Sequence, residues 1–485
     1  MPTVMKQTPF LTWCLDLGLL VVILSLLSFL LLGTRPLFAP DEGRYAEIAR
    51  EMVRSGHFVT PYLNGIKYFE KPPLFYWLTA LAIKVGGPTV WAVRWVSAII
   101  GIIGCLATYC AGRLLFTRKT GWFAALILAT SGLYFTMDHT VSLDCTVTVF
   151  MSISLYGILL AMQSKKVMHS RLYAYLAAIA AALAVLTKGL IGLVFPGLIV
   201  LIWLTLTHQF WGVLKKLYLP TSCLIFLIIA LPWHILVQLH NPEFFNFYFI
   251  NQQILRYTEA SVGHYQPIWF FIPILIAGFL PWIIFLPKAA WQAINHPTRL
   301  FFLVWAIVIF VFFSFSKSKL IPYILPLFPA IAMLVGEYLQ RSKLSFRLII
   351  SLFIVMGIVM LLGLVIIPRY QTRSILPLVN IIQPLLKNNA EIITYHIYYQ
   401  DLPFYLQRRI TIVDWQNELT FGMQHQDTHE WMINDQTLLK RLQSNTHPIF
   451  VLMSNDDLAH FQTQYPQLHY KILGKTPQNV VIEND

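Results

Sequence analysis

Long apolar segments constrain this chain more than any other feature of its sequence. Most are close to 20 residues long, the length that a helix needs to cross a bilayer. Because the bilayer core offers no water to the backbone, we predict a polytopic α-helical membrane protein. The composition agrees: 57% of the residues are hydrophobic and only 12% are charged, which excludes an ordinary soluble domain and a disordered chain. About eleven spans are expected, at residues 10–32, 89–112, 121–137, 145–162, 172–187, 189–207, 217–239, 267–287, 300–315, 320–339 and 347–367.

The charged residues are distributed unevenly. Residues 1–367 contain 26 Lys and Arg against 11 Asp and Glu, whereas residues 368–485 contain 9 against 11. Much of the positive excess lies in short connections between apolar segments, as is typical of cytoplasmic loops. We therefore expect the N-terminus inside, and the first long loop, about 34–88, and the C-terminal tail outside. The net charge of +13 reflects this topology, so no nucleic-acid partner is expected.

The first long loop is predicted to contain an amphipathic helix. Its apolar residues recur at helical spacing after Asp41, with charged residues opposite them, and Gly56 is expected to end the helix. Such a helix is typical of one lying on the outer membrane surface. The apolar stripe consists of Tyr45, Ile48, Ala49, Met52 and Val53.

The C-terminal residues differ in pattern from the rest. Short apolar runs at 392–395, 410–413 and 448–453 alternate with polar stretches of helical character. This alternation predicts a small α/β domain over residues 368–485, next to a transmembrane domain over 1–367. No glycine-rich phosphate loop is present there, so no nucleotide cofactor is expected.

Acidic residues are scarce in the membrane part, and ionisable groups at membrane depth are functional candidates. Asp41 and Glu42 follow Pro40 at the start of the predicted helix. Two interpretations of Asp41 are open: a helix cap, or a carboxylate that orients or deprotonates an acceptor. Asp144 follows another span, at the same predicted face of the membrane.

A second group surrounds the dipeptide Glu70-Lys71, which precedes two prolines. Lys71 is a candidate for holding a phosphate, and Glu70 for holding a metal or an amine. The alternative is a lysine that extends to the membrane surface beside a solvated glutamate. Asp41, Glu70, Lys71 and Asp144 are all expected at outer ends of spans, where they can share one outward-facing cavity.

Basic residues are also expected on this face. Arg256 is a candidate for binding a lipid phosphate, because a guanidinium binds phosphate in a bidentate manner. A cavity with Lys and Arg in its lining indicates an anionic substrate. The remaining candidates are Lys188, His264, Lys317 and Lys319.

Two long blocks, at residues 39–52 and 63–77, closely resemble the lipid A aminoarabinose transferases. These are GT-C glycosyltransferases that use polyprenyl-phosphate sugars and are distantly related to protein O-mannosyltransferases. The resemblance extends over nearly the whole chain through shorter matches at 186–189, 264–269, 281–282, 316–319, 323–326, 401–406 and 418–422.

The resemblance implies roles for individual residues. Asp41 and Asp144 match the outer carboxylates of the active site. Glu70 matches a carboxylate on the metal or substrate side, where Glu42, Lys188, His264, Lys317 and Lys319 are also placed. The groups expected to hold the carrier phosphate are Arg44, Lys71 and Arg256. Gln253 stands where the family has a histidine near a bound metal, so a divalent metal and the identity of the sugar are left open.

Several functions remain to be distinguished. The leading hypothesis is transfer of an amino sugar, such as 4-amino-4-deoxy-arabinose, from a polyprenyl phosphate to lipid A or a related envelope glycolipid. It places the enzyme in the bacterial inner membrane, with its active site and C-terminal domain in the periplasm. The alternatives are a protein O-glycosyltransferase, a transporter of lipid-linked sugar, and an adaptor domain on an inert anchor. No repeated halves support a transporter, and the charged first loop disfavours an inert anchor.

Overall fold

The computed structural model describes residues 10–255, 265–366, 374–444 and 447–484. Contacts divide the chain into two compact units. We call the first the membrane unit; it comprises the residues up to Leu32 together with Trp95–Gly363. The second, the sheet unit, comprises Gly33–Arg94 and Leu364–Asp485. The first long loop thus packs with the C-terminal residues, while the functional domain division at residue 367 stays a prediction.

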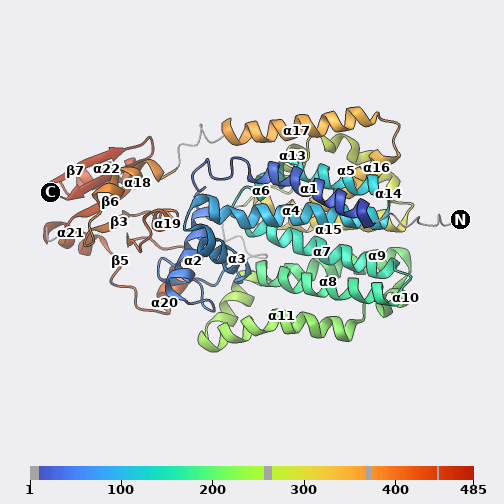
Figure 1. The fold of residues 1–485 in the computed structure, drawn as a ribbon. Coiled ribbons are helices and arrows are strands. Elements are labelled where there is room, and N and C mark those ends of the chain that lie inside the picture. The colour runs from blue at the N-terminus through green and yellow to red at the C-terminus, as the bar shows by residue number, and fades with distance from the viewer. Residues whose placement is uncertain (1–9, 256–264, 367–373, 445–446, 485) are drawn as a thin grey trace. The chain divides into compact units, whose positions relative to one another are not determined.

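Eight helices in the described chain are long and apolar enough to cross a membrane, which confirms the predicted polytopic helical class (Figure 1). Two further segments are pairs of helices bent by 69° and 105°, and α9 (Ile191–Thr207) is shorter and contains Pro196. The predicted segments thus correspond to apolar helices, but fewer than eleven are straight spans. The eight helices are α1 (Phe10–Phe29), α4 (Val90–Leu115), α7 (Leu143–Gln163), α8 (Val167–Lys188), α11 (Leu219–His240), α15 (Pro297–Phe315), η4 with α16 (Ile321–Arg341) and α17 (Phe346–Ile366).

Shorter elements complete the membrane unit. The first bent pair is α5 (Arg118–Ala129) with α6 (Gly132–Asp138), and the second is α13 (Phe271–Gly278) with η3 (Trp282–Phe285) and α14 (Leu286–Ala293). The connections include α10 (Phe210–Lys216) and the π-helix η1 (Asn246–Leu255). Helix α8 packs against both α7 and α11 (Figure 1).

Close helix packing in this unit depends on small residues. A Cβ atom on Gly112 of α4 would lie only 2.8 Å from the Cα of Gly121 in α5. Larger side chains would force these backbones apart, as is common where membrane helices cross. The two glycines therefore fix how closely α4 and α5 approach.

A buried acid stabilises the same region. Asp16 of α1 accepts hydrogen bonds from the Tyr109 hydroxyl at 2.5 Å and from Arg113 at 2.7 Å. Arg118 of α5 pairs with its other oxygen at 2.6 Å. An unpaired carboxylate at this depth would be costly, so these partners explain how α1 tolerates an acidic residue.

The sheet unit contains a six-stranded sheet with the order β5-β4-β3-β6-β8-β7. The strands β3, β4, β5 and β6 are parallel, whereas β8 and β7 run antiparallel at one edge. This confirms the predicted small α/β domain. The strands are β3 (Glu391–Tyr395), β4 (Thr411–Val413), β5 (Met432–Ile433), β6 (Ile449–Ser454), β7 (Tyr470–Lys475) and β8 (Asn479–Asn484).

Helices connect and cover these strands. Inward side chains such as Val451, Ile482 and Phe461 form one buried apolar core. The helices of the sheet unit, including α2 and α3 from the first long loop, are α2 (Asp41–Ser55), α3 (Leu74–Gly86), α18 (Leu376–Ile382), η6 (Gln383–Leu385), α19 (Leu402–Leu406), α20 (Thr420–Gln424), α21 (Asp435–Ser444) and α22 (Asn455–Gln464).

A small hairpin joins the first loop to the sheet. Strands β1 (Tyr62–Leu63) and β2 (Ile66–Lys67) flank Asn64-Gly65, whose positive φ angles suit a two-residue hairpin turn. The Asn64 side chain donates to the carbonyl of Ile410 and accepts from its amide, both at 3.0 Å. Gln426 bonds the backbone of the hairpin in the same manner. These amides tie segments about 350 residues apart into one unit.

The predicted helix after Pro40 is confirmed as α2, and Gly56 ends it with a left-handed φ of 76°. The expectation that its charges lie on an open face is wrong, because Glu42, Glu47 and Arg50 are buried. Arg50 compensates Glu47 through two bonds of 2.6 and 2.7 Å. Paired charges can be buried where isolated ones cannot, so the sequence pattern alone was misleading.

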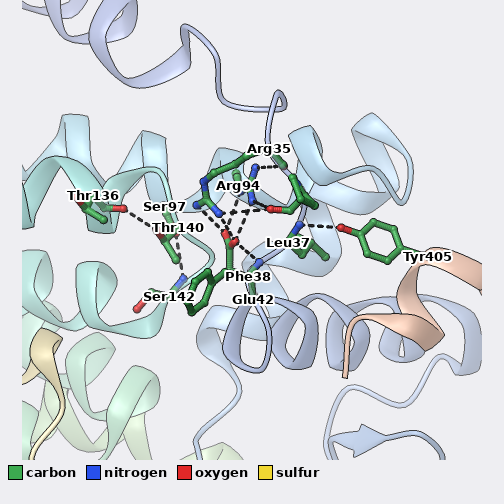
Figure 2. Close-up of polar contacts among 11 residues, drawn as sticks. Arg35, Leu37, Phe38, Glu42, Arg94, Ser97, Thr136, Thr140, Ser142 and Tyr405 are labelled. Atoms are coloured by element: carbon green, nitrogen blue, oxygen red, sulfur yellow. Dashed lines mark hydrogen bonds and ion pairs between the residues drawn. The ribbon is translucent and has the colours of Figure 1, made fainter. Parts of the chain in front are cut away.

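Glu42 lies at the centre of a buried ion cluster (Figure 2). Arg94 donates to both of its oxygens at 2.9 Å, and Arg35 binds it at 2.7 Å. The Phe38 amide adds a bond of 2.7 Å. Burial alone would raise the pKa of Glu42, but the charges of Arg94 and Arg35 outweigh burial and lower it to about 2. The cluster therefore fixes the chain entering α2.

We predict that Glu42→Gln lowers the free energy of unfolding by about 3–5 kcal/mol at pH 7, because it leaves two arginines without their counter-charge. The stabilisation by Glu42 is present above its ordinary pKa of 4.5 and is lost as the pH falls toward 2. Thermal unfolding of the purified protein, followed from pH 7 to pH 3, measures both effects.

Glu430→Gln is the matched control. The Glu430 side chain is 78% exposed and pairs only weakly with Arg409 at 3.2 Å, so the change is expected to cost less than about 1 kcal/mol. Equal unfolding temperatures for the Glu42 variant and the unaltered protein at pH 7 would contradict the prediction.

Candidate active site

Asp41 begins α2 and points away from the core. Its side chain is 57% exposed, and the helix is preceded by Pro40 with no side-chain cap. The neighbouring Glu42 bonds the Phe38 amide. The capping interpretation of Asp41 therefore fails, and an accessible carboxylate is left at the helix start.

Arg44, one helical turn later, is held by several acceptors. Its Nε donates to Gln400 at 2.9 Å, and its Nη atoms lie 3.3 Å from the Tyr68 hydroxyl and 3.3 Å from Glu418. Asp41 lies at 3.7 Å. The guanidinium is thus fixed in position beside the exposed Asp41.

The electrostatics of this cluster keep Arg44 charged. Burial opposes its charge, but Tyr68, Tyr45, Glu70 and Glu418 outweigh burial and raise its pKa well above the ordinary value. Burial raises the pKa of Glu418, although Arg44 opposes that shift. The charge of Glu70 acts on Arg44, so both predicted residues belong to one electrostatic site.

Glu70 and Lys71 are partly buried between β2 and α3. Pro72 and Pro73 follow them and directly precede α3, whose Trp77 donates to the Phe58 carbonyl at 2.8 Å. This rigid connection limits how far the two charged side chains can move. The partial burial disfavours the interpretation of two freely solvated charges.

Asp401 lies beside the start of α2, and the sequence did not identify it as a site residue. A Cβ on Gly43 would lie 2.5 Å from the Asp401 backbone nitrogen, so only glycine permits this contact. Neither carboxylate oxygen of Asp401 has a hydrogen-bond partner within the described part of the chain. Burial, with the charge of Glu42 adding to it, raises the Asp401 pKa to about 7.

Asp144 and Lys188 form an ion pair in the membrane unit. Asp144 lies in the first turn of α7, where the Ser142 hydroxyl donates to it at 3.2 Å and caps the helix. Lys188 ends α8, with its ammonium 4.9 Å from the centre of the Tyr323 ring. Two predicted site residues from different helices are thus brought together.

The two predicted lysines near residue 318 differ in exposure. Lys317 is exposed, whereas Lys319 is buried and donates to the carbonyls of Gln266 and Ser316. Burial lowers the pKa of Lys319. Lys319 thus connects two loops of the membrane unit, and Lys317 has the accessible charge.

Arg256 and His264 lie outside the described residues, as does the side chain of Gln253. Their roles stay predictions. The shared cavity also stays a prediction, because Asp41, Glu70 and Lys71 belong to the sheet unit and Asp144 to the membrane unit.

One set of metal-capable side chains is found among the described residues: His396, Asp414 and Asp435, which follow strands of the sheet and have ligand atoms within 4.8 Å. Glu70 does not belong to this set. A metal held by Glu70 therefore stays a prediction, and no step below depends on one.

Apolar grooves lie along α8 in the membrane unit. One, of about 420 Å³, is lined by residues of α7, α8, α9 and α11, including Ala177, Pro196 and Phe226. A neighbouring pocket of about 220 Å³ includes Val185 and Gly189, on either side of Lys188 in the sequence. These grooves suit hydrocarbon chains, and the smaller one includes the residue that follows Lys188.

The sequence predicted Asp41, Arg44, Glu70 and Lys71 as site residues but did not include Gln400 and Glu418, which hold Arg44. The sequence did contain a signal for these partners, because the segments 401–406 and 418–422 belong to the resemblance. These short matches did not show, however, that the two segments lie near α2.

Two family models match separate parts of the chain. The model described as dolichyl-phosphate-mannose-protein mannosyltransferase matches residues 13–248. The model described as aminoarabinose transferase C-terminal domain matches residues 378–484.

Individual proteins agree with the second description. An undecaprenyl phosphate-α-4-amino-4-deoxy-L-arabinose arabinosyl transferase of Proteus mirabilis is 35% identical over 67% of this chain and 59% of its own length. The enzyme of the same name from Edwardsiella ictaluri is 33% identical over 66% of this chain and 59% of its own length. The matched part of the chain thus spans about three fifths of these relatives.

A solved structure extends the similarity to both units. The crystal structure of ArnT from Cupriavidus metallidurans bound to undecaprenyl phosphate has a TM-score of 0.83 and 29% identity, over 97% of this chain and 98% of that one. The chain therefore belongs to the aminoarabinose transferase-like family of polytopic GT-C proteins.

Proposed function

We propose that this protein is a glycosyltransferase that moves an amino sugar from a polyprenyl phosphate to lipid A or a related envelope glycolipid. The observation that carries the proposal is the exposed Asp41 beside a rigidly held Arg44. A carboxylate and a fixed guanidinium provide one group for the acceptor and one for the phosphate of the donor.

The comparisons support the chemistry of the donor. The relatives from Proteus mirabilis and Edwardsiella ictaluri are named for an undecaprenyl phosphate-linked aminoarabinose. The ArnT crystal structure holds undecaprenyl phosphate. In the present chain, the apolar grooves along α8 have the character needed for a polyprenyl chain, and Lys188 provides a positive charge beside the smaller one.

The proposed reaction is a displacement at the anomeric carbon of the donor sugar. An acceptor oxygen forms a bond to this carbon while the bond to the carrier phosphate oxygen breaks, and the phosphate leaves with the electron pair. Arg44 and Lys71 stabilise the negative charge that grows on the phosphate, with Arg256 as a further predicted contact.

The role of Asp41 depends on the acceptor. A phosphate acceptor with a second pKa of about 6 is already ionised at neutral pH, so Asp41 then orients it or binds the sugar amine. A hydroxyl acceptor has to lose its proton, and Asp41 then accepts it. Asp144 is the second proposed carboxylate, held in place by Lys188 and Ser142. Glu42 is proposed to act by positioning the start of α2.

We place the enzyme in the bacterial inner membrane, with Asp41 and the C-terminal domain in the periplasm. The basic connections between spans favour this orientation. The acceptor lipid is then reached from the same membrane face as the donor.

A protein acceptor is the second candidate. The mannosyltransferase description of the model that matches residues 13–248 favours it. The match of the C-terminal residues to the aminoarabinose transferase domain favours the lipid acceptor instead.

We predict that Asp41→Asn lowers transfer by more than about 100-fold, because the neutral amide neither accepts a proton nor pairs with an amine. Mass spectrometry of lipid A from cells with the intact gene, a deletion and this variant measures the product. A mass increase of one amino sugar is expected only with the intact gene.

Asp456→Asn is the matched control, since Asp456 is another exposed acid in the first turn of a helix, α22. It is expected to leave the product unchanged. Wild-type product from the Asp41 variant would contradict the assignment. Unmodified lipid A with the intact gene, together with a glycosylated protein, would favour the second candidate.

We predict that Arg44→Lys lowers the rate of transfer by about tenfold or more. A lysine ammonium cannot contact Gln400, Tyr68 and Glu418 together in the geometry of a guanidinium. Steady-state kinetics with a polyprenyl-phosphate sugar measures the loss. The exposed Arg347 at the start of α17 provides the control, because Arg347→Lys is expected to have no effect.

A further inference from the structure

The sheet unit contains a large cavity at the opposite end of α2 from Asp41. Its volume is about 1250 Å³, and residues of α2, the sheet and the segment before β3 line it. Arg54 in this lining lies 13 residues after Asp41, which corresponds to about 20 Å along a helix. The cavity is therefore separate from the site assigned to the transfer reaction.

Arginines dominate the charges of this cavity. Five of them line it, together with three glutamates. The arginines are Arg50, Arg54, Arg408, Arg409 and Arg441. Such a concentration of guanidinium groups on one concave surface is typical of sites for phosphate groups.

Two of the arginines are not neutralised. Arg54 is exposed and has no hydrogen bond or ion pair among the described residues. Among the described residues, the guanidinium of Arg408 donates only to the Ala390 carbonyl, at 3.3 Å. Both guanidiniums therefore have donors left for a ligand.

Within the described part of the chain, the glutamates of the lining leave the charges of Arg54 and Arg408 unpaired. Glu391 is already bound by Arg441, by the Thr411 hydroxyl at 2.7 Å and by His447 at 3.3 Å. Burial, reinforced by the nearby Glu47, raises the pKa of Glu51 to about 8, so this residue is mostly neutral at pH 7.

Other arginines of the lining are held in place. Arg50 is fixed by Glu47, and Arg409 stacks 4.0 Å above the Trp431 ring. Fixed guanidiniums lose little side-chain entropy when they bind an anion. Asn388 and Asn389 add amide groups that suit sugar hydroxyls.

We propose that this cavity binds a phosphate-bearing saccharide. Its volume exceeds what a single phosphate ion fills, its charge selects an anion, and its amides and aromatic ring suit sugar. The ligand is either the headgroup of a phosphorylated glycolipid or a free sugar phosphate. The proposal goes beyond the transfer reaction and does not depend on it.

Calorimetric titration of the full-length protein with glucose 1,6-bisphosphate tests the proposal. We expect saturable binding that weakens as the salt concentration rises, and no binding of glucose. The double variant Arg54→Gln/Arg408→Gln is expected to weaken binding by about tenfold or more, because two charge-assisted contacts are lost.

The double variant Lys471→Gln/Lys475→Gln is the matched control. It removes two exposed cations from strand β7 outside the cavity and is expected to bind like the unaltered protein. If the arginine double variant fails to fold, as judged by thermal unfolding, Arg54→Gln alone provides the test, since Arg54 is exposed.

A competition experiment separates the two sources of ligand. Displacement of the bisphosphate by lipid A vesicles, but not by phosphatidylcholine vesicles, indicates a glycolipid headgroup. Unchanged binding in their presence indicates a free sugar phosphate. Absence of saturable binding at low salt, equal binding of glucose, or equal losses in the two double variants would overturn the proposal.

Discussion

The buried pairing of Glu42 with Arg94 and Arg35 is the interaction on which the candidate active site depends. It fixes the first turn of α2, because the Glu42 carboxylate also accepts the Phe38 amide. Asp41 and Arg44 are attached to the same turn. A carboxylate in this position without its arginines would be strongly destabilising, so the two guanidiniums are structural requirements of the site. The functional residues are thus positioned by a largely buried cluster.

The second requirement is that the first loop and the C-terminal residues form one folded unit. Gln400 and Glu418, which hold Arg44, both belong to the C-terminal segment. Asn64 bonds Ile410 in place of a backbone partner, and Gly43 allows α2 to approach Asp401. The C-terminal domain is therefore not an accessory that could be removed from the chain. Without the C-terminal domain, Arg44, which is proposed to stabilise the donor phosphate, would lose its contacts with Gln400 and Glu418.

Strong local patterns determined how much of the fold the sequence could predict. The apolar segments coincide with helices, and β3, β4 and β6 match the three apolar runs. Strand β7 was missed because it is largely exposed at the sheet edge and has no apolar run, and β5 has only two residues. The bends of 69° at α5/α6 and 105° at α13/η3 fall at short breaks within apolar segments, which a hydropathy pattern does not resolve. For the site, the motifs identified the residues of α2 but not their partners more than 350 residues away.

Asp41 and Glu42 show why partners matter more than residue type. They are adjacent acids, and sequence reasoning placed both near the substrate. Successive helix residues point about 100° apart, so one is directed outward and the other into the core. The exposed acid keeps its freedom to meet a substrate, whereas the buried acid, with its pKa lowered to about 2, is charged and paired at neutral pH. The same distinction separates Lys317 from Lys319, of which only the first has an exposed charge. Which of two neighbouring charged residues can meet a substrate thus depends on contacts distant in the sequence.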